Sequence, residues 1–191
     1  PIKKIIVSTY QSVSGAGAGG IVELEEQTRK IICEKSEGVR CETFPVQIAF
    51  NVIPHIDIFL DNGYTKEEMK MVHETQKIFN DYSMKISATA VRVPVFTSHS
   101  ESLSIETKDK LSLEAVRDAL HKADGIKLMD DFKNAVYPTT LNSSNRDDVY
   151  VGRLREDISS ANGISMWVVG DQLRKGAALN AVQIAEILVK G

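Results

Sequence analysis

Residues 86–107 read ISATAVRVPVFTSHSESLSIET, and this stretch decides the fold class. The run from Ile86 to Val93 is rich in small and β-branched residues, which is typical of a strand. Apolar and polar residues alternate from Ser102 to Thr107, which predicts a second strand with one covered face. Between the two runs, Pro94 permits a turn. The stretch therefore predicts two consecutive strands.

The rest of the chain adds further elements in a mixed order. Thr65 and Glu68 form a capping box for a helix whose buried stripe is expected at Met69, Val72 and Phe79. Helices are also expected over residues 21–34, from Ser112 with Glu114 in its first turn, and over 173–190, with strands over 4–9, 39–44, 149–154 and 164–169. The last strand is largely apolar and is expected inside the sheet. Because strands and helices neither alternate strictly nor separate, we predict one α+β domain with a mixed sheet over residues 1–191.

The bulk composition narrows the classes of function. The 191 residues are 42% hydrophobic and 26% charged, which suits a globular domain. A formal net charge of -3 with scattered Lys and Arg predicts no nucleic-acid partner. The apolar stretches are too short for a bilayer span and residues 1–4 begin no secretory signal, so we expect a soluble, cytoplasmic protein with no membrane partner. Cys33 and Cys41 fit no C-x-x-C pattern and are interpreted as structural thiols.

Gly15, Gly17 and Gly20 match the pattern G-x-G-x-x-G between the first strand and a helix. In a dinucleotide-binding fold the first glycine lies tight against the strand end, and an acid such as Glu42 would hold the ribose. Here residues 10–14 intervene, and the later chain lacks repeated βαβ units. The other interpretation is that small residues let the backbone turn sharply and approach packed side chains or an anion.

Arg92 and His99 are the main candidates for chemistry. Arg92 lies between two valines in a run that looks buried, so its guanidinium needs an anion, either from a substrate or from an internal salt bridge. His99 could be catalytic or structural. In a regular strand their seven-residue separation would place the two side chains on opposite faces and about 23 Å apart. They can share one site only if the chain bends between Pro94 and Ser98.

Two polar pairs could also belong to a site. Glu67 and Lys70 share a face near the start of the capped helix, where they could meet an ammonium group and an anion such as phosphate, or form a solvated face. Asp171 and Gln172 follow an apolar strand, where polar groups commonly face a ligand, although Asp171 could simply cap the terminal helix. The histidines and cysteines show no metal-ligand spacing, so no metal site is expected.

Five segments together closely resemble the aspartate-semialdehyde dehydrogenases, in the same order and spacing over nearly the whole chain. The segments are Ser8–Gln11 with the Ser-Gly-Ala-Gly loop, Asp61–Lys70, Val91–Val93 through His99-Ser100, Val151–Arg153, and Gly170–Gln172 through Gly176–Ala178. Each segment alone is weak evidence for the resemblance, but the combination of all five is specific to this family. The related acetylglutamyl-phosphate reductases fit these segments less well.

The resemblance implies a reaction and an architecture. The reaction is the NADPH-dependent reductive dephosphorylation of L-aspartyl 4-phosphate to L-aspartate 4-semialdehyde and phosphate, through a cysteine thioester. It belongs to the biosynthesis of lysine, threonine and methionine. The implied architecture is a homodimer whose largely antiparallel sheet is similar to that of the C-terminal domain of glyceraldehyde-3-phosphate dehydrogenases.

The resemblance also implies roles for individual residues. Arg92 would bind the substrate α-carboxylate, Glu67 the α-amino group and Lys70 the phosphate. His99 would act as acid and base on the thiohemiacetal, a role that suits an imidazole titrating near neutrality. Gln11 would help to position the acyl group.

Parts of that enzyme are not expected in this chain. Gln172 would lie near the nicotinamide of NADP, but the family carries its nucleotide-binding domain and an Asn-Cys nucleophile N-terminal to the matching region. Cys33 lies within a predicted helix and Cys41 follows an arginine, so neither fits the nucleophile's context. The chain is therefore expected to be the substrate-binding and dimerisation domain, inactive alone. Its terminal helix, residues 173–191, is expected to pack on the nucleotide-binding domain because little of its surface is polar.

Three alternatives remain beside this interpretation. The chain could be a stand-alone binding or regulatory module that retains the pocket without catalysis. It could be a domain similar to acetylglutamyl-phosphate reductase. It could also bind a dinucleotide through residues 15–20.

Overall fold

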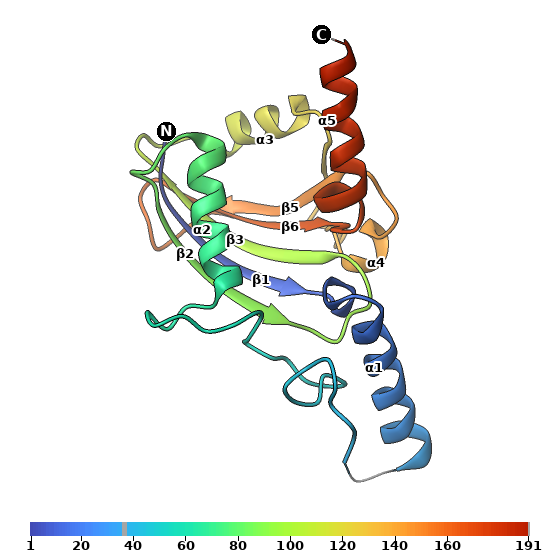
Figure 1. Ribbon diagram of the computed structural model, residues 1–191. Helices are drawn as coiled ribbons and strands as arrows, with labels where there is room; N and C mark the ends of the chain where they lie inside the picture. Colours follow the sequence, from blue (N-terminus) through green and yellow to red (C-terminus); the bar gives the residue numbers. More distant parts are fainter. Residues whose placement is uncertain (36–37, 191) are drawn as a thin grey trace.

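A six-stranded sheet organises the molecule (Figure 1). The structure, a computed structural model, describes residues 1–35 and 38–190. In spatial order the strands are β2 (Lys85–Arg92), β1 (Ile2–Gln11), β3 (His99–Thr107), β6 (Gly163–Gly170), β5 (Val149–Glu156) and β4 (Ile126–Leu128). The outer pairs β1–β2 and β4–β5 are parallel, whereas β1–β3, β3–β6 and β5–β6 are antiparallel. The predicted α+β fold with a mixed, largely antiparallel sheet is confirmed, and β6 lies inside the sheet as expected.

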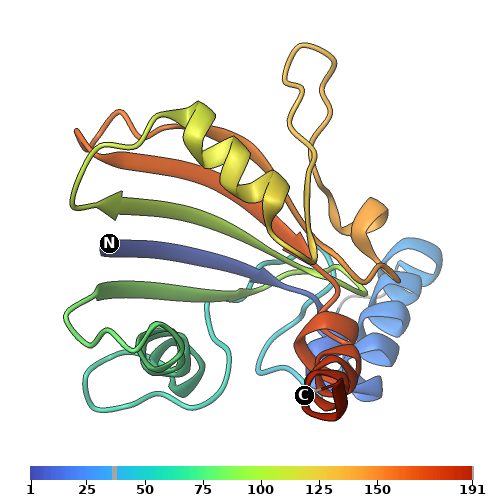
Figure 2. The same cartoon turned by 90° about the horizontal axis from the view of Figure 1, so that it is seen from above.

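Two helices cover one face of the sheet, α3 over the β5–β6 side and α2 near β2 (Figure 2). From α2 (Lys66–Phe79), Met71 packs on a cluster that includes Ile5 and Val7 of β1. From α3 (Leu113–Lys122), Val116 and Leu120 pack on a second cluster formed mainly by β5 and β6. Removal of these apolar side chains from water is the main force that holds the helices on the sheet.

The predicted capping box at the start of α2 is confirmed. The Thr65 hydroxyl accepts a hydrogen bond from the Glu68 N–H (3.3 Å), and the Glu68 carboxylate accepts one from the Thr65 N–H (2.8 Å). The other Glu68 oxygen accepts the Ala90 N–H of β2 at 2.9 Å, so the buried carboxylate is satisfied by backbone donors. The predicted buried stripe is wrong at Phe79, which is 58% exposed, because the face of α2 towards the sheet contains Glu68 and Met71.

The expected strand over residues 39–44 does not form. This segment lies against α1 (Ala18–Arg29), which follows a 3-10 turn (Val13–Ala16) and continues into a π turn (Lys30–Glu34). Side chains of α1 take the hydrogen bonds that a neighbouring strand would take: the buried Glu23 carboxylate accepts from the Glu42 and Thr43 N–H groups, and Gln27 donates to the Arg40 carbonyl. The backbone of residues 39–44 is therefore satisfied without a sheet.

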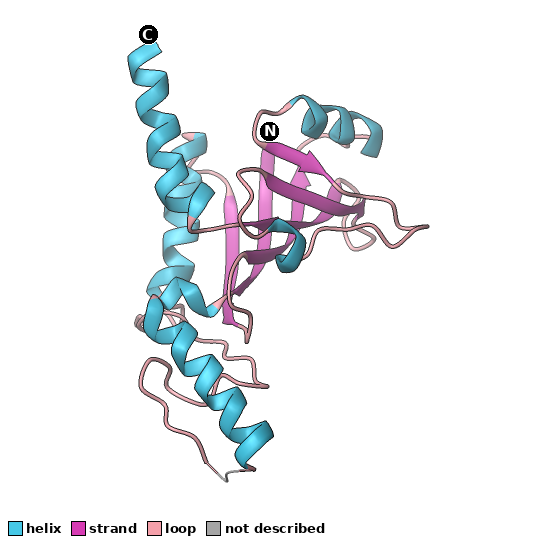
Figure 3. Cartoon of the chain, turned by 90° about the vertical axis from the view of Figure 1, so that its right-hand side faces the viewer, coloured by secondary structure: helices cyan, strands magenta, loops and turns pink. Residues whose placement is uncertain are grey.

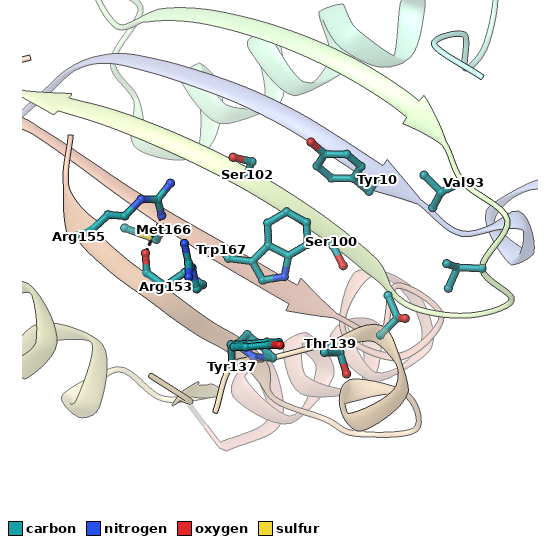
Figure 4. A pocket seen from close by; sticks show the side chains of 13 residues that line it. Tyr10, Val93, Ser100, Ser102, Tyr137, Thr139, Arg153, Arg155, Met166 and Trp167 are labelled. Atoms are coloured by element: carbon teal, nitrogen blue, oxygen red, sulfur yellow. Dashed lines mark hydrogen bonds between the residues drawn. The ribbon is translucent and has the colours of Figure 1, made fainter. Parts of the chain in front are cut away.

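The opposite face of the sheet carries small and polar side chains at its centre. Ser100, Ser102, Tyr10 and Trp167 line a pocket of about 660 Å³ there (Figure 4), and the rings of Tyr10 and Trp167 lie 5.3 Å apart. The pocket extends to the connection that leads into the short helix α4 (Thr140–Ser143).

The C-terminal helix extends beyond the sheet. After a π turn (Arg174–Ala178), α5 (Leu179–Lys190) rises beside the sheet while α1 descends on the same side (Figure 3). Its large apolar side chains Val182, Ile184, Ile187, Leu188 and Val189 are all more than half exposed. No helix within residues 1–35 and 38–190 is long and apolar enough to cross a membrane.

Candidate active site

Four strand ends meet at one edge of the sheet. Because β1 and β2 are parallel, they end together, and Gln11 pairs with Arg92. Strand β3 is antiparallel to β1 and therefore begins at this edge, where its first residue, His99, pairs with Gly170 at the end of β6. The edge thus gathers polar side chains from segments that are distant in the sequence.

The connection between β2 and β3 bends sharply around the end of β1. The Val13 N–H donates to the Val95 carbonyl at 2.8 Å, which ties the connection to the segment that follows β1. Ser98 then adopts a left-handed conformation, with φ 69°, immediately before β3. The bend expected between Pro94 and Ser98 is confirmed.

Gly15 lies where Arg92 and His99 converge. A Cβ added to Gly15 would lie 2.9 Å from Arg92 Nη1 and 3.3 Å from His99 Nε2, so only glycine allows both side chains to approach this closely. At Gly20 a Cβ would lie 2.5 Å from the Val13 carbonyl oxygen. These glycines act here by permitting close packing, the second of the two interpretations of the glycine loop.

Arg92 is 6% exposed, yet no carboxylate among the described residues forms an ion pair with it. Its Nη1 donates to the Ser12 carbonyl at 2.7 Å, and its guanidinium carbon lies 5.9 Å from the centre of the Phe44 ring. Burial lowers the pKa of Arg92, and the charge of Glu67 opposes that change. The expected alternative, an internal salt bridge, is not what the structure shows, so most of the guanidinium donors remain available to an anion.

His99 is held as a neutral imidazole. Burial lowers its pKa from 6.5 to about 4, the Arg92 charge adds to this effect, and the Ser98 backbone and the Asp171 carboxylate oppose it. The Ser12 N–H, which can only donate, reaches His99 Nδ1 at 3.1 Å. Because Nδ1 must accept that bond, the proton of the neutral ring is on Nε2, the atom that faces Gly15.

Glu67 and Lys70 lie at the same edge, on the first turns of α2. The Gln11 amide donates to the Glu67 carboxylate at 3.4 Å, and Lys70 Nζ lies 3.6 Å from the other Glu67 oxygen. The Glu67 side chain is 23% exposed and that of Lys70 is 54% exposed. This part of the helix surface therefore faces the other polar groups, whereas Glu74 and Lys77, further along α2, are exposed.

Gln172, which follows β6, lines the same cleft as His99. Its Nε2 donates to the Ser14 hydroxyl at 2.7 Å, and its buried Oε1 has no hydrogen-bond partner among the described residues. Asp171 accepts from the Leu173 N–H at 3.0 Å, but the π turn that leads into α5 begins after Leu173 and has no side-chain cap, so the capping interpretation is wrong for this carboxylate. A cleft of about 240 Å³ lies between His99 and Gln172.

Comparison with known proteins decides the family. The profile described as "Semialdehyde dehydrogenase, dimerisation domain" matches residues 1–175. The chain belongs to this family. It is 54% identical, over 99% of its length, to 55% of the aspartate-semialdehyde dehydrogenase of Aquifex aeolicus (strain VF5). The chain thus spans about half the length of the curated relatives it matches.

Solved structures of semialdehyde dehydrogenases share the fold. The crystal structure of aspartate semialdehyde dehydrogenase II complexed with ASA from Vibrio cholerae is 54% identical, with a TM-score of 0.94 over 99% of this chain and 55% of that one. The enzyme with NADP from Candida albicans is 25% identical, with a TM-score of 0.69 over 98% of this chain and 51% of that one. The chain therefore corresponds to the dimerisation-domain half of these dehydrogenases.

Several site residues of this semialdehyde dehydrogenase domain escaped the sequence analysis. Ser12 orients both Arg92 and His99 through its backbone N–H and carbonyl. Every residue type except proline has both groups, so the sequence could not indicate this role. Glu101 and Lys175 line the cleft beside His99, and burial raises the pKa of the Glu101 carboxyl. A polar residue two positions after His99 on the same strand was the available signal for Glu101, because such residues share a face.

The stability of this domain should depend on pH through His99. The unfolded imidazole titrates near pH 6.5 and the folded one at about 4, so the unfolded chain binds more protons between these values. The contribution of His99 to stability is therefore complete above pH 6.5 and is lost as the pH decreases towards 4.

The free energy of unfolding of the domain should decrease between pH 7.5 and pH 4.5 because of His99. We expect His99→Gln to make that decrease about 2–3 kcal/mol smaller, measured by urea denaturation. An unchanged pH dependence in His99→Gln would contradict a buried neutral imidazole.

Proposed function

We propose that this chain is the substrate-binding and dimerisation half of an aspartate-semialdehyde dehydrogenase. The reaction is the NADPH-dependent conversion of L-aspartyl 4-phosphate to L-aspartate 4-semialdehyde and phosphate in amino-acid biosynthesis. The observation that supports it most is the convergence at Gly15 of a neutral imidazole and a buried guanidinium that has no carboxylate partner within residues 1–35 and 38–190. These groups suit a substrate that carries both an amino-acid carboxylate, which the guanidinium would bind, and a reacting acyl group, which the imidazole would contact.

We assign the α-carboxylate and α-ammonium groups of the substrate to Arg92 and Glu67, and its phosphate to Lys70. The buried guanidinium of Arg92 would form two parallel hydrogen bonds to the α-carboxylate. The Glu67 carboxylate would accept hydrogen bonds from the α-ammonium group, and Lys70, more exposed, would meet phosphate at the entrance. Because Glu67 already interacts with Gln11 and Lys70, both of its oxygens are oriented before the substrate binds.

His99 would donate a proton to the acyl oxygen and later accept it back. With Nδ1 bonded to the Ser12 N–H, the Nε2–H is the group that can donate to the oxygen as negative charge develops on it. The Nε2 atom would take the proton back when the thiohemiacetal hydroxyl becomes the aldehyde carbonyl. The Gln11 amide would hold the acyl group beside it.

Gln172 is suited to a nicotinamide. Its Oε1 is buried and has no hydrogen-bond partner in the described part of the chain, and a carboxamide NH₂ would supply the missing donor. NADPH would supply the hydride for the reduction when bound.

We further propose that the chain works joined to a nucleotide-binding domain that supplies the nucleophilic cysteine. Cys33 lies in the π turn that ends α1, which extends away from the sheet (Figure 1), and both it and Cys41 are exposed. The apolar residues of α5 are exposed in this chain, and a neighbouring domain would cover them.

A homodimer would bury the open face of the sheet. The pocket of about 660 Å³ on that face is lined by Tyr10, Tyr137 and Trp167, with Arg153 and Arg155 at one side (Figure 4). Aromatic and arginine side chains are enriched at protein interfaces, and the family is described as a dimerisation domain.

A binding module without catalysis is the second candidate function. The position of both cysteines away from the site favours it, because the described residues place no thiol near His99. Such a module would keep the Arg92 and Glu67 contacts to an amino acid but would have no attacking group.

One reconstitution experiment separates these possibilities. The chain joined to a nucleotide-binding domain of the family should reduce NADP⁺ in the presence of L-aspartate 4-semialdehyde and phosphate, and the chain alone should not. In the joined protein, hydrogen exchange of the α5 amides should slow. Binding of the semialdehyde without activity in the joined protein would favour the binding module. Micromolar binding of NADPH to the chain alone would instead favour the dinucleotide-binding glycine loop.

A further inference from the structure

The residue before His99 is held in a strained conformation. Ser98 has a φ of 69°, in the left-handed region that non-glycine residues rarely adopt, and its side chain is fully buried. This conformation is strained and persists only where neighbouring contacts hold it. Because Ser98 directly precedes β3, its backbone sets the direction in which the His99 side chain leaves the strand.

Among the described residues, the side-chain hydrogen bonds to Thr97 and Ser98 come from one residue, Ser144. Its hydroxyl lies 2.9 Å from the Ser98 hydroxyl and 2.7 Å from the Thr97 hydroxyl, and it donates to the Thr140 carbonyl at 2.7 Å. A hydroxyl has one donor and two acceptor positions. With its proton used on Thr140, Ser144 accepts from both Thr97 and Ser98, so all of its hydrogen-bonding capacity is used at this junction.

The same short segment also reaches the other side of the cleft. The N–H of Asn145, the next residue, donates to Asp171 Oδ2 at 2.7 Å, and the other Asp171 oxygen accepts from the Leu173 N–H. Asp171 directly precedes Gln172, whose amide contacts the glycine-loop segment. Two adjacent residues after α4 therefore connect the turn before His99 to the segment that carries Gln172.

We propose that Ser144 is a positioning residue for His99: its hydroxyl fixes the left-handed Ser98 and thereby aims the imidazole at the Ser12 N–H and the reacting acyl oxygen. This inference rests on the proposed function, because it assigns a role to Ser144 through the proton transfer by His99. The Ser144 hydroxyl acts through other residues, because its hydrogen bonds go to Thr97, Ser98 and Thr140.

The expected consequence of losing Ser144 is a reduced turnover with little change in substrate affinity. In Ser144→Ala the hydroxyls of Thr97 and Ser98 lose a shared acceptor, and the strained turn can relax. Arg92 and Glu67 lie on β2 and α2 and keep their contacts, so substrate binding should persist. A small displacement of a catalytic group can reduce the rate substantially, and we expect kcat to fall about 10- to 100-fold with KM within about 3-fold.

Ser143→Ala provides the matched control. Ser143 is fully buried and directly adjacent, and its hydroxyl donates to Asn142 within the same short helix. Both substitutions remove one hydroxyl from the same segment. A general loosening of α4 would affect both variants alike, whereas the proposal requires the loss of kcat in Ser144→Ala only.

The experiment measures kcat, KM and the pH profile in the protein joined to its nucleotide-binding domain, together with the titration of His99 by NMR. In Ser144→Ala the pKa of His99 should rise from about 4 towards 6.5, as the ring loses its enclosed position. Ser98→Ala should also lower kcat, and the double variant should lose no more than Ser144→Ala alone, because that variant has already lost the contact between Ser98 and Ser144. The titration of His99 still tests the role of Ser144 if catalysis is impaired for another reason, because it reports the environment of the imidazole directly.

The outcomes separate this inference from the proposed function. Equal kinetics and equal His99 titration in Ser144→Ala and Ser143→Ala would overturn the role of Ser144 while leaving the dehydrogenase proposal intact. Full additivity of the Ser98 and Ser144 substitutions would also overturn it. Absence of dehydrogenase activity in the wild-type joined protein would overturn the proposed function, and the inference with it.

Discussion

Replacement of His99 by alanine should lower kcat by a factor of about 10²–10⁴ in the protein joined to its nucleotide-binding domain, with a small change in KM. The imidazole touches the proposed position of the acyl oxygen through Nε2–H, and its other nitrogen is fixed by the Ser12 N–H at 3.1 Å. An oriented donor of this kind interacts most strongly when negative charge develops in the transition state. Its removal therefore affects turnover more than binding.

Steady-state kinetics in the direction of NADP⁺ reduction provide the measurement. His121→Ala is the control, because this histidine is exposed on α3 and does not line the cleft beside His99. Its kinetics should match those of the wild type. A His99→Ala enzyme with wild-type kcat would show that the imidazole has only a structural role.

Replacement of Arg92 by alanine should lower kcat/KM by a factor of about 10²–10³, mainly through KM. Loss of one partner from a buried, charged hydrogen-bonded pair costs 2–5 kcal/mol, and each 1.4 kcal/mol corresponds to a factor of ten. Arg92 is suited to such a pair because it is 6% exposed and has no carboxylate partner among the described residues. The substrate carboxylate would supply that partner.

Arg92→Lys tests the geometry of the pair in addition to its charge. Lysine keeps the charge but cannot form two parallel hydrogen bonds, so we expect only partial recovery of kcat/KM. Because Arg92 also donates to the Ser12 carbonyl, a thermal denaturation of both variants must accompany the kinetics. Arg29→Ala, which removes an exposed arginine of α1, is the control. A wild-type KM in a folded Arg92→Ala protein would exclude a role in substrate binding.

Local patterns were sufficient to predict most of the elements. The helix that begins after Thr65 and the helix that begins after Ser112 carry their caps in adjacent residues, and both caps are present. The apolar run of β6 predicted its position inside the sheet. Where a partner came from elsewhere in the chain, local patterns were insufficient: the segment 39–44 reads as a strand but bonds to Glu23 and Gln27 of α1.

The candidate site was only partly predictable. Arg92 and His99 were identifiable as a charge in an apolar run and as a possible acid or base, but their regular spacing argued against a shared site. The resemblance to a family suggested a bend, and the structure places it between β2 and β3, with Ser98 in a left-handed conformation. Ser12 and Ser144 could not have been found in this way, because their contacts are made by a backbone N–H and by a hydroxyl of ordinary type.

The sequence by itself determined the fold class, most helix starts, and the identity of the charged and titratable groups, because periodicity and capping depend on residues within one or two turns of each other. The tertiary structure alone decided which groups share an environment. The pairing of β1 with both β2 and β3 places Gln11, Arg92 and His99 at one edge. Burial at that edge then lowers the pKa values of His99 and Arg92, since desolvation and charge proximity arise only when distant segments come together.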